Sequence, residues 1–379
     1  MAPTSRILIV DDEPFNIDFL EQELEDLGYQ TLSASNGKIA LDVIGSDAPD
    51  LILLDIMMPV MDGFEVLSSL KSNQKHQHIP VIVISAMSDM QSIVRGIKLG
   101  AEDYLPKPFD EVLLQARISS ALEKKHLRDL EQAHLQSLER ELEIGHEIQS
   151  GFLPDVLPQI EGWKLNAFFR PAREVAGDFY DVFELPDRKI AFFLGDVADK
   201  GVGSALYMAL YRSLLRSSMN NRMLLDDPSS KLIRVVNHTN DYVCLTHEKA
   251  LFVTLFAGIL DTENNQLTYL NAGHNPPLHL QGTREHWIAP TGPAVGMLDG
   301  QKFLAKTIEL IPGDRLFIYS DGLEDVKNGN DEFFGRESLA ESFIEQGSSI
   351  ESIVDHLAGF MKEEQQYDDL TLLILEKSV

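Results

Sequence analysis

The sequence is poor in cysteine, in basic residues and in long apolar runs, and each shortage excludes a class of protein. Its one cysteine, Cys244, cannot form an internal disulfide or a zinc site built on several cysteines. The balance of 32 basic to 60 acidic residues argues against electrostatic binding to nucleic acid or to an anionic membrane. No apolar run approaches the roughly 20 residues that a membrane helix needs, and the acids near the start come too early for a signal peptide. We therefore expect a cytoplasmic protein without nucleic-acid or membrane partners.

The length and composition indicate a globular chain with more than one domain. Its 379 residues exceed what one ordinary core contains, and 44% of them are hydrophobic while 24% are charged. The pattern of apolar segments changes twice along the chain. We predict a first domain over residues 5–122, a helical connector over 123–156 and a second domain over 157–379.

The first domain alternates short apolar segments with amphipathic helical ones. The apolar segments are RILIV, QTLSA, DLILLD, IPVIVIS and DYLP. Continuous apolar strands separated by helices are typical of a doubly wound α/β fold, here with a parallel five-stranded sheet. Ligands of such sheets bind beyond the carboxyl ends of the strands, so the residues at those ends are the candidates for a site.

Polar side chains follow four of these strands. They are Asp11 and Asp12 after the first strand, Asp55 after the third, Ser85 after the fourth and Lys107 after the fifth. The acids can hold Mg²⁺ through oxygen ligands. The metal and Lys107 can neutralise a phosphoryl group on Asp55, and Ser85 can hydrogen-bond the oxygens of that group. Alternatively, each acid only caps the helix that follows it, which explains neither Lys107 nor the loop DIMMPVMDG.

These motifs make the first domain similar, end to end, to the receiver domain of two-component response regulators. The resemblance implies that a sensor histidine kinase is the phosphodonor and that Asp55 is the phosphoacceptor. It also implies that Asp12, Asp55 and the main-chain carbonyl of Met57 bind Mg²⁺.

The resemblance assigns a switching role to two more residues of the first domain. Ser85 and Tyr104 would form the switch pair, and Lys107 would contact the phosphoryl group and be followed by a cis bond to Pro108. For Tyr104 the alternative is a half-buried strand aromatic that has no switching role.

The connector is rich in helix-forming residues and lacks proline before Pro154. Its leucines form two groups whose phase slips between them: Leu127 and Leu130, then Leu135, Leu138 and Leu142. The pattern predicts a helix with a stutter, and two interpretations stay open. One is a coiled coil that makes a homodimer and changes register on phosphorylation, and the other is a single amphipathic helix lying on either domain. We expect its last apolar residues, Ile144, Ile148 and Leu153, to dock on the second domain.

The second domain has longer apolar strands, such as KIAFFLGDV and LFVTLFAGIL, with helical stretches between them. We expect helices over 203–216 and 231–246 and a helical region over 337–362. Strands in runs with helices inserted in pairs favour antiparallel sheets covered by helices, an α+β layered sandwich.

Acidic residues again fall at strand edges in the second domain, often beside glycine. The principal ones are Asp178, Asp196, Asp321 and Asp368. Carboxylates that converge without basic partners repel one another, and bound cations are the simplest resolution. Because no histidine or cysteine joins them, Mg²⁺ or Mn²⁺ fits best, and acids on two strands suit a pair of metals with a bridging carboxylate.

Five phrases give the second domain a resemblance to a known family: PAREVAGDFYD, GDVADKGVGSALYM, NAGHNPP, YSDGLEDVKN and YDDLTLLIL. In this order they resemble the metal-dependent serine/threonine protein phosphatases of the 2C type, in the bacterial branch named for the stage II sporulation phosphatase. The resemblance implies that Asp178 and Asp196 bind or bridge two metals, with the carbonyl of Val197 as a further ligand. Asp321 and Asp368 would hold the second metal site, and Asp369 matches a position of lesser importance for metal binding.

The two resemblances together imply a response regulator in which phosphorylation of Asp55 controls a protein phosphatase. Related proteins act on phosphoserine or phosphothreonine of anti-sigma-factor antagonists, the route called partner switching. The alternative is a non-catalytic adaptor that binds a regulatory protein in a phosphorylation-dependent way, and the presence of all four principal carboxylates argues against it. No arginine before Asp178 clearly matches the phosphate-binding one of eukaryotic relatives, so the metals would hold most of the substrate phosphate.

Overall fold

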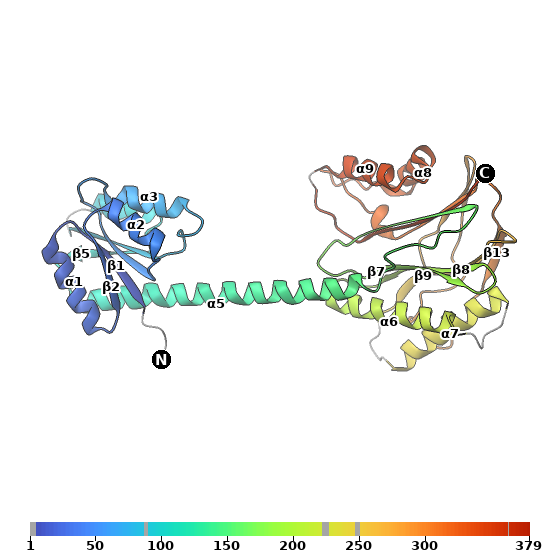
Figure 1. Ribbon diagram of the computed structural model, residues 1–379, viewed down its shortest axis with the longest axis horizontal. Helices are drawn as coiled ribbons and strands as arrows, with labels where there is room; N and C mark the ends of the chain where they lie inside the picture. Colours follow the sequence, from blue (N-terminus) through green and yellow to red (C-terminus); the bar gives the residue numbers. More distant parts are fainter. Residues whose placement is uncertain (1–4, 87–89, 222–226, 247–250, 363) are drawn as a thin grey trace. The chain divides into compact units, whose positions relative to one another are not determined.

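A computed structural model describes residues 5–86, 90–221, 227–246, 251–362 and 364–379 of the chain (Figure 1). The chain divides into two compact units, Met1–Leu138 and Glu139–Val379, and each is described by itself. Among the described helices, none is both long and apolar enough to cross a membrane.

The first unit is built on a parallel five-stranded sheet with the strand order β2-β1-β3-β4-β5. This confirms the predicted doubly wound α/β fold. The strands are β1 (Arg6–Val10), β2 (Gln30–Ala34), β3 (Leu51–Asp55), β4 (Val81–Ala86) and β5 (Asp103–Lys107). The helices are α1 (Pro14–Asp26), α2 (Gly37–Ser46), α3 (Gly63–Ser72), α4 (Met90–Lys98) and the first part of α5 (Glu111–Ser150).

Alternating strand residues of this sheet enter two cores. Leu8, Leu54 and Val83 pack with α2 and α3, whereas Ile9 and Leu53 pack with α1 and α5. Both faces of the central strands are therefore covered, which explains why these segments are apolar at every position. The carboxyl ends of β1, β3 and β5 meet at one rim of this sheet.

The second unit is a sandwich of two antiparallel five-stranded sheets. One sheet has the order β13-β10-β9-β8-β7 and the other β12-β11-β14-β15-β6. The long strands are β6 (Trp163–Arg170), β7 (Asp178–Leu185), β8 (Lys189–Val197), β9 (Val253–Asp261), β10 (Gln266–Ala272), β14 (Arg315–Tyr319) and β15 (Leu370–Lys377). The short strands are β11 (Leu278–Gln281), β12 (Arg284–Trp287) and β13 (Lys306–Glu309). The predicted α+β layered sandwich is thus confirmed.

Helices cover the outer face of each sheet of the sandwich (Figure 1). Helices α6 (Val202–Met219) and α7 (Pro228–Thr246) pack on the first sheet, and α8 (Gly335–Gln346) and α9 (Ile350–Met361) pack on the second. Phe192, Ile318 and Leu373 lie in the core between the sheets. The helical region expected over 337–362 is two helices, because Gly347 at φ 65° ends α8 and the Ser349 side chain caps α9.

The connector lies in the 40-residue helix α5, which also contains the last helix of the first unit. No glycine or proline interrupts the chain between residues 111 and 144, so the helix has no reason to stop at the predicted boundary. The division between the two units falls inside α5, after Leu138. The domain boundaries 5–122, 123–156 and 157–379 stay predictions.

Four of the five leucines in the seam of α5 are solvent-exposed, and Leu142 is half-buried. Leu127 and Leu135 are 59% and 53% exposed, so neither side chain is buried by its own unit, and both interpretations of the seam stay predictions. The predicted docking of Ile144 and Ile148 is wrong, since they are 49% and 62% exposed. Only Leu153 packs against the sandwich, at the core beneath α6 and α7. A different face of the helix, carrying Gly145 and Gln149, contacts the loop before β7 instead.

Candidate functional site

The rim of the first unit brings three acids together. Ligand oxygens of Asp11, Asp12 and Asp55 all lie within 4.8 Å of one another. The Lys107 ammonium donates to Asp11 Oδ2 at 2.9 Å and to Asp55 Oδ2 at 3.0 Å. Asn16, which sequence reasoning did not identify, donates from its side-chain amide to both oxygens of Asp11. The oxygen-only donor set suits Mg²⁺.

Charge and burial act against each other at this rim. Burial raises the pKa of Asp55, Lys107 opposes the rise and Asp11 adds to it. Burial alone would lower the pKa of Lys107, but its hydrogen bonds to Asp11 and Asp55 outweigh burial and raise that pKa. Lys107 is therefore cationic at neutral pH, and its charge is available to a phosphoryl group on Asp55.

The other predicted residues of the first unit lie on strands of the same sheet or in the loop after β3. Ser85 is buried near the end of β4, and Tyr104 is half-buried on β5 with the Arg117 guanidinium 5.5 Å from its ring centroid. The Met57 side chain is 77% exposed in the loop after β3. The peptide bond between Lys107 and Pro108 is cis, as predicted. The roles of Ser85, Tyr104 and Met57 stay predictions.

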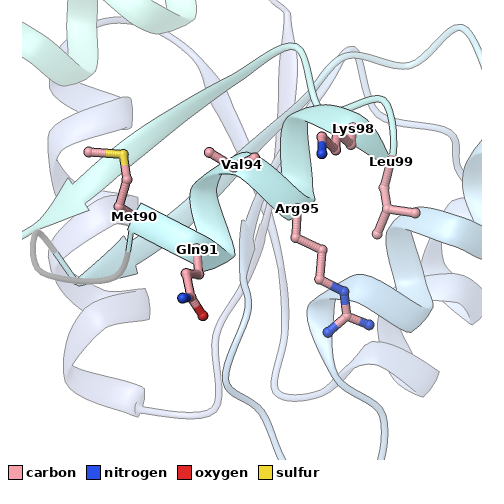
Figure 2. A pocket seen from close by; sticks show the side chains of 6 residues that line it. All are labelled: Met90, Gln91, Val94, Arg95, Lys98 and Leu99. Carbon is pink, nitrogen blue, oxygen red and sulfur yellow. The ribbon is translucent and has the colours of Figure 1, made fainter.

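A groove on the outer side of α4 is separate from the acids of the rim. Figure 2 shows the side chains that line it, which are Met90, Gln91, Val94, Arg95, Lys98 and Leu99. None of the site residues predicted from the sequence lies among them, and we assign the groove no role.

In the second unit, Asp178 and Asp196 are opposite each other on β7 and β8. Thr254 of β9 is the next residue in the same row, opposite Asp196. Register partners on neighbouring strands project from the same face of a sheet. Leu194, two residues before Asp196, packs in the core between the sheets, so this row faces the other sheet. From that sheet, the Thr371 hydroxyl donates to Asp178 Oδ2.

The other two principal acids come from the second sheet. Asp321 opens a short 3₁₀ turn after β14, and Asp368 stands just before β15. The two segments touch at Gly322, where a Cβ would lie 2.0 Å from the Asp369 carbonyl oxygen. Only glycine permits this approach, which places Asp321 beside Asp368. Asp196 and Asp368 line one narrow cleft, together with Ala172, Arg173, Val175, Gly177, Asp199, Lys200, Gly201 and Asp369.

These carboxyl groups disfavour one another's charge. Burial, with the charges of Asp196 and Asp369, raises the pKa of Asp178 well above its ordinary value. Burial and the charges of Asp321 and Asp368 raise the pKa of Asp196 to about 7. Burial and the charge of Asp368 raise the pKa of Asp321 to about 6. Bound cations would relieve this repulsion, and a donor set made of carboxylate oxygens fits Mg²⁺ or Mn²⁺.

Two further predicted residues, Asp369 and Val197, both contact the loop that precedes Asp178. Asp369 is buried and accepts hydrogen bonds from the main-chain amides of Ala172 and Gly177, both at 2.8 Å. It therefore holds the loop that leads to Asp178. Val197 is buried at the end of β8, and its carbonyl oxygen lies against Gly177, where a Cβ would be 3.0 Å away. Whether that carbonyl is a metal ligand stays a prediction.

The end of α5 holds the same loop from its other side. The side-chain amide of Gln149 donates to the Ala176 carbonyl at 2.7 Å and accepts from the Ala176 amide at 2.8 Å. Nδ1 of His146 lies 2.8 Å from the Glu174 carbonyl oxygen. Because Asp178 follows two residues after Ala176, the position of α5 affects the position of a principal carboxylate.

Sequence reasoning missed two residues of the site. His274 is buried, its Nδ1 lies 2.8 Å from the Thr254 hydroxyl, and burial lowers its pKa to about 4. His274 is therefore neutral at physiological pH, and its hydrogen bond holds the side chain of Thr254, which is the register partner of Asp196. Lys200 places its ammonium 2.8 Å from Asp368 Oδ2. Its place in the phrase GDVADKG, four residues after Asp196, was the available signal.

Comparison with known proteins identifies both parts of the chain. The family model of stage II sporulation protein E (SpoIIE) matches residues 186–378, just over half of the chain. The chain belongs to the SpoIIE family. The response regulator receiver domain model matches residues 7–119, so the SpoIIE-family domain follows a receiver domain.

Curated relatives share parts of this SpoIIE-family chain. Protein IcfG of Synechocystis sp. is 39% identical over 264 residues, which are 63% of this chain and 42% of IcfG. Response regulator PleD of Caulobacter vibrioides is 44% identical over 117 residues, 31% of this chain and 26% of PleD. The chain thus spans less than half the length of either relative.

Solved structures show the fold of the SpoIIE-family domain. The SiaA-PP2C domain of Pseudomonas aeruginosa aligns with a TM-score of 0.55 and 22% identity, and covers 64% of this chain and 98% of that one. The RsbU and RsbW domains of a Mycobacterium tuberculosis protein align with a TM-score of 0.50 and 23% identity, over 60% of this chain and 63% of that one. The sandwich is therefore a PP2C-like fold.

Proposed function

We propose that this protein is a response regulator in which phosphorylation of Asp55 controls a metal-dependent protein serine/threonine phosphatase. The observation that carries the proposal is the convergence of four carboxylates at one end of the sandwich. Asp178 and Asp196 come from one sheet, and Asp321 and Asp368 from loops of the other. Burial raises the pKa of three of them, as expected for acids that act with a bound cation.

The four carboxylates would hold two Mg²⁺ or Mn²⁺ ions, with the Val197 carbonyl as a further ligand. Such ions lower the pKa of bound water and neutralise charge on a phosphoryl group. The chain supplies the rest by positioning: Thr371 orients Asp178, and Asp369 fixes the main chain before it. No serine or cysteine nucleophile is required, since water is the attacking group in this chemistry.

The proposed substrate is a protein that carries phosphoserine or phosphothreonine. An anti-sigma-factor antagonist is the candidate that the family resemblance suggests, in a partner-switching pathway of the cytoplasm. A non-catalytic adaptor is the competing function. It is disfavoured because an adaptor has no need to keep four convergent acids whose repulsion costs stability.

Regulation would begin with a sensor histidine kinase that phosphorylates Asp55 with Mg²⁺ bound at the rim of Asp11 and Asp12. We propose that α5 transmits the change, because Gln149 holds the loop before Asp178. The exposed leucine seam of α5 would serve as a homodimer contact. Ser85 and Tyr104 would report the state of Asp55 to this helix.

Hydrolysis of a small aryl phosphate by the purified full chain tests the proposal. Turnover should require Mn²⁺ or Mg²⁺ and stop with EDTA, and Asp196→Asn should abolish it without unfolding the protein. The matched control is Asp187→Asn, at the exposed turn at the other end of the same β7–β8 pair, where φ is 59° and asparagine is well tolerated. A wild-type protein that binds a phosphoprotein but hydrolyses neither it nor the aryl phosphate would favour the adaptor.

A further inference from the structure

The ammonium of Lys200 lies among the acids of the candidate active site. Nζ is 2.8 Å from Asp368 Oδ2 and donates to the Tyr367 carbonyl oxygen at 2.9 Å. It also lies 3.9 Å from the centroid of the Tyr367 ring. The side chain is 31% exposed, so it stands at the mouth of the cleft and not in its floor.

Among the described residues that line the cleft, Lys200 and Arg173 carry positive charge, and Lys200 is the one paired with a principal carboxylate. Its charge opposes the repulsion felt by Asp321 and by Asp325. Among the described residues, no other cation lies within ion-pair distance of Asp178, Asp196, Asp321 or Asp368. A divalent cation held by Asp368 would compete with this ammonium for the same carboxylate and would repel it.

The local chain leaves Lys200 free to change partners. It lies in the short loop between β8 and α6, flanked by Asp199 at φ 71° and Gly201 at φ 88°. The ammonium sits on a flexible four-carbon stem and carries three donors, which suits a phosphoryl group with several oxygens. Arg173 also lines the cleft, but of these two cations only Lys200 is paired with one of the four principal carboxylates.

We propose that Lys200 is a substrate-binding residue that exchanges one anion for another. It pairs with Asp368 until a divalent cation takes that carboxylate, and it then binds the phosphoryl group of the substrate. This inference rests on the proposed function and extends it, because one side chain, Lys200, then affects both the binding of the cation and the binding of the phosphate. The exchange breaks no covalent bond and needs no further reactant.

Two binding titrations on the full chain test the exchange without turnover. Mn²⁺ binding is measured for the wild type and for Lys200→Met, with Asp196→Asn as the baseline for binding by the receiver rim. Inorganic phosphate is then titrated at saturating Mn²⁺. We expect Lys200→Met to bind Mn²⁺ about tenfold more tightly and phosphate about tenfold more weakly, since one charge-assisted hydrogen bond is lost in each case.

The matched control is Lys189→Met, at the end of β8 remote from the cleft, which removes the same kind of charge. It should leave both affinities unchanged. Equal Mn²⁺ affinity, or equal phosphate affinity, of Lys200→Met and the wild type would overturn the exchange. A wild type that binds Mn²⁺ but hydrolyses no phosphomonoester would contradict the proposed function alone, because the two titrations would still report on Lys200.

Discussion

Asp181 of β7 and Asp196 of the neighbouring strand β8 should respond to the same substitution in opposite ways. Asp181 is fully buried on the face of the sheet that packs against α6. Its oxygens lie 2.9 Å from Arg212 Nε and 2.5 Å from Arg216 Nη1. Asp196 and its register partner Asp178 lie on the other face of the sheet, among acids. Asp181 is therefore a structural ion-pair residue, and we expect Asp181→Asn to destabilise the sandwich.

The size of the effect follows from the burial of the two arginines. Removing one partner of a buried ion pair costs about 3–5 kcal/mol, because the other charge is left uncompensated. The Arg216 side chain is 35% exposed and can turn to solvent, whereas Arg212 is only 15% exposed. Since one arginine is left unpaired and asparagine keeps the volume, we expect a loss of about 3 kcal/mol in the free energy of unfolding.

Urea unfolding followed by tryptophan fluorescence measures this loss on the full chain. The protein has two tryptophans, Trp163 and Trp287, and both lie in the second unit, so the signal reports on that unit alone. Titrations in EDTA at pH 7.5 should give a lower midpoint for Asp181→Asn with an unchanged slope. Asp196→Asn is the matched substitution, and it should be at least as stable as the wild type because it relieves repulsion.

Two results would refute this reasoning. One is an Asp181→Asn variant as stable as the wild type, which would mean that the ion pairs contribute nothing. The other is an Asp196→Asn variant that loses as much stability as Asp181→Asn, which would mean that the acids of the cleft are compensated without a metal.

Three further predictions concern the same domain. Burial lowers the pKa of His274 to about 4, so as the pH falls from 6.5 to 4 the unfolded chain takes up a proton more readily than the folded one. The wild type should therefore lose about 3 kcal/mol of its free energy of unfolding over this range. His274→Gln should lack this loss, which urea unfolding across the same pH range would measure. Gln149→Ala should raise the hydrogen-exchange rate of the Ala176 amide by about tenfold, since that buried amide loses its acceptor; an unchanged rate would contradict the role of α5 in holding this loop. Mn²⁺ at about 100 times its dissociation constant should stabilise the wild-type sandwich by about 2.7 kcal/mol in the same fluorescence assay, and Asp196→Asn much less.

The site of the receiver domain was predictable because its fold follows from local patterns. Parallel strands separated by helices bring the residues after each strand to one rim, so Asp11, Asp55 and Lys107 could be placed together from their order alone. In the structure Lys107 joins the two acids through a hydrogen bond to each. Asn16 was not predicted, because nothing in the strand pattern distinguishes it from other polar residues at the start of α1.

In the phosphatase-like site the acids were predictable from the sequence, but the residues that position them were not. Asp196 and Asp178 stand in recognisable phrases, whereas Thr254 joins them only through the register of β8 and β9. Gln149 contacts the main-chain amide and carbonyl of Ala176, and a residue of any type other than proline at that position would offer the same two groups. The contact could therefore not be predicted from the sequence. The prediction that Ile148 docks on the second domain was wrong because it assumed that the apolar face of the helix makes the contact. The hydrogen bonds of Gln149 to the main chain of Ala176 make it instead.

The central claim is that the receiver domain controls the phosphatase, and one measurement tests it most directly. Initial rates of Mn²⁺-dependent aryl phosphate hydrolysis by the full chain are compared with and without beryllofluoride, which mimics phosphorylated Asp55. The control is Asp55→Asn, which lacks the acceptor carboxylate. The account predicts a change in rate for the wild type and none for Asp55→Asn, and the direction of the change gives the sign of regulation. Equal wild-type rates in both conditions, with beryllofluoride bound, would contradict it.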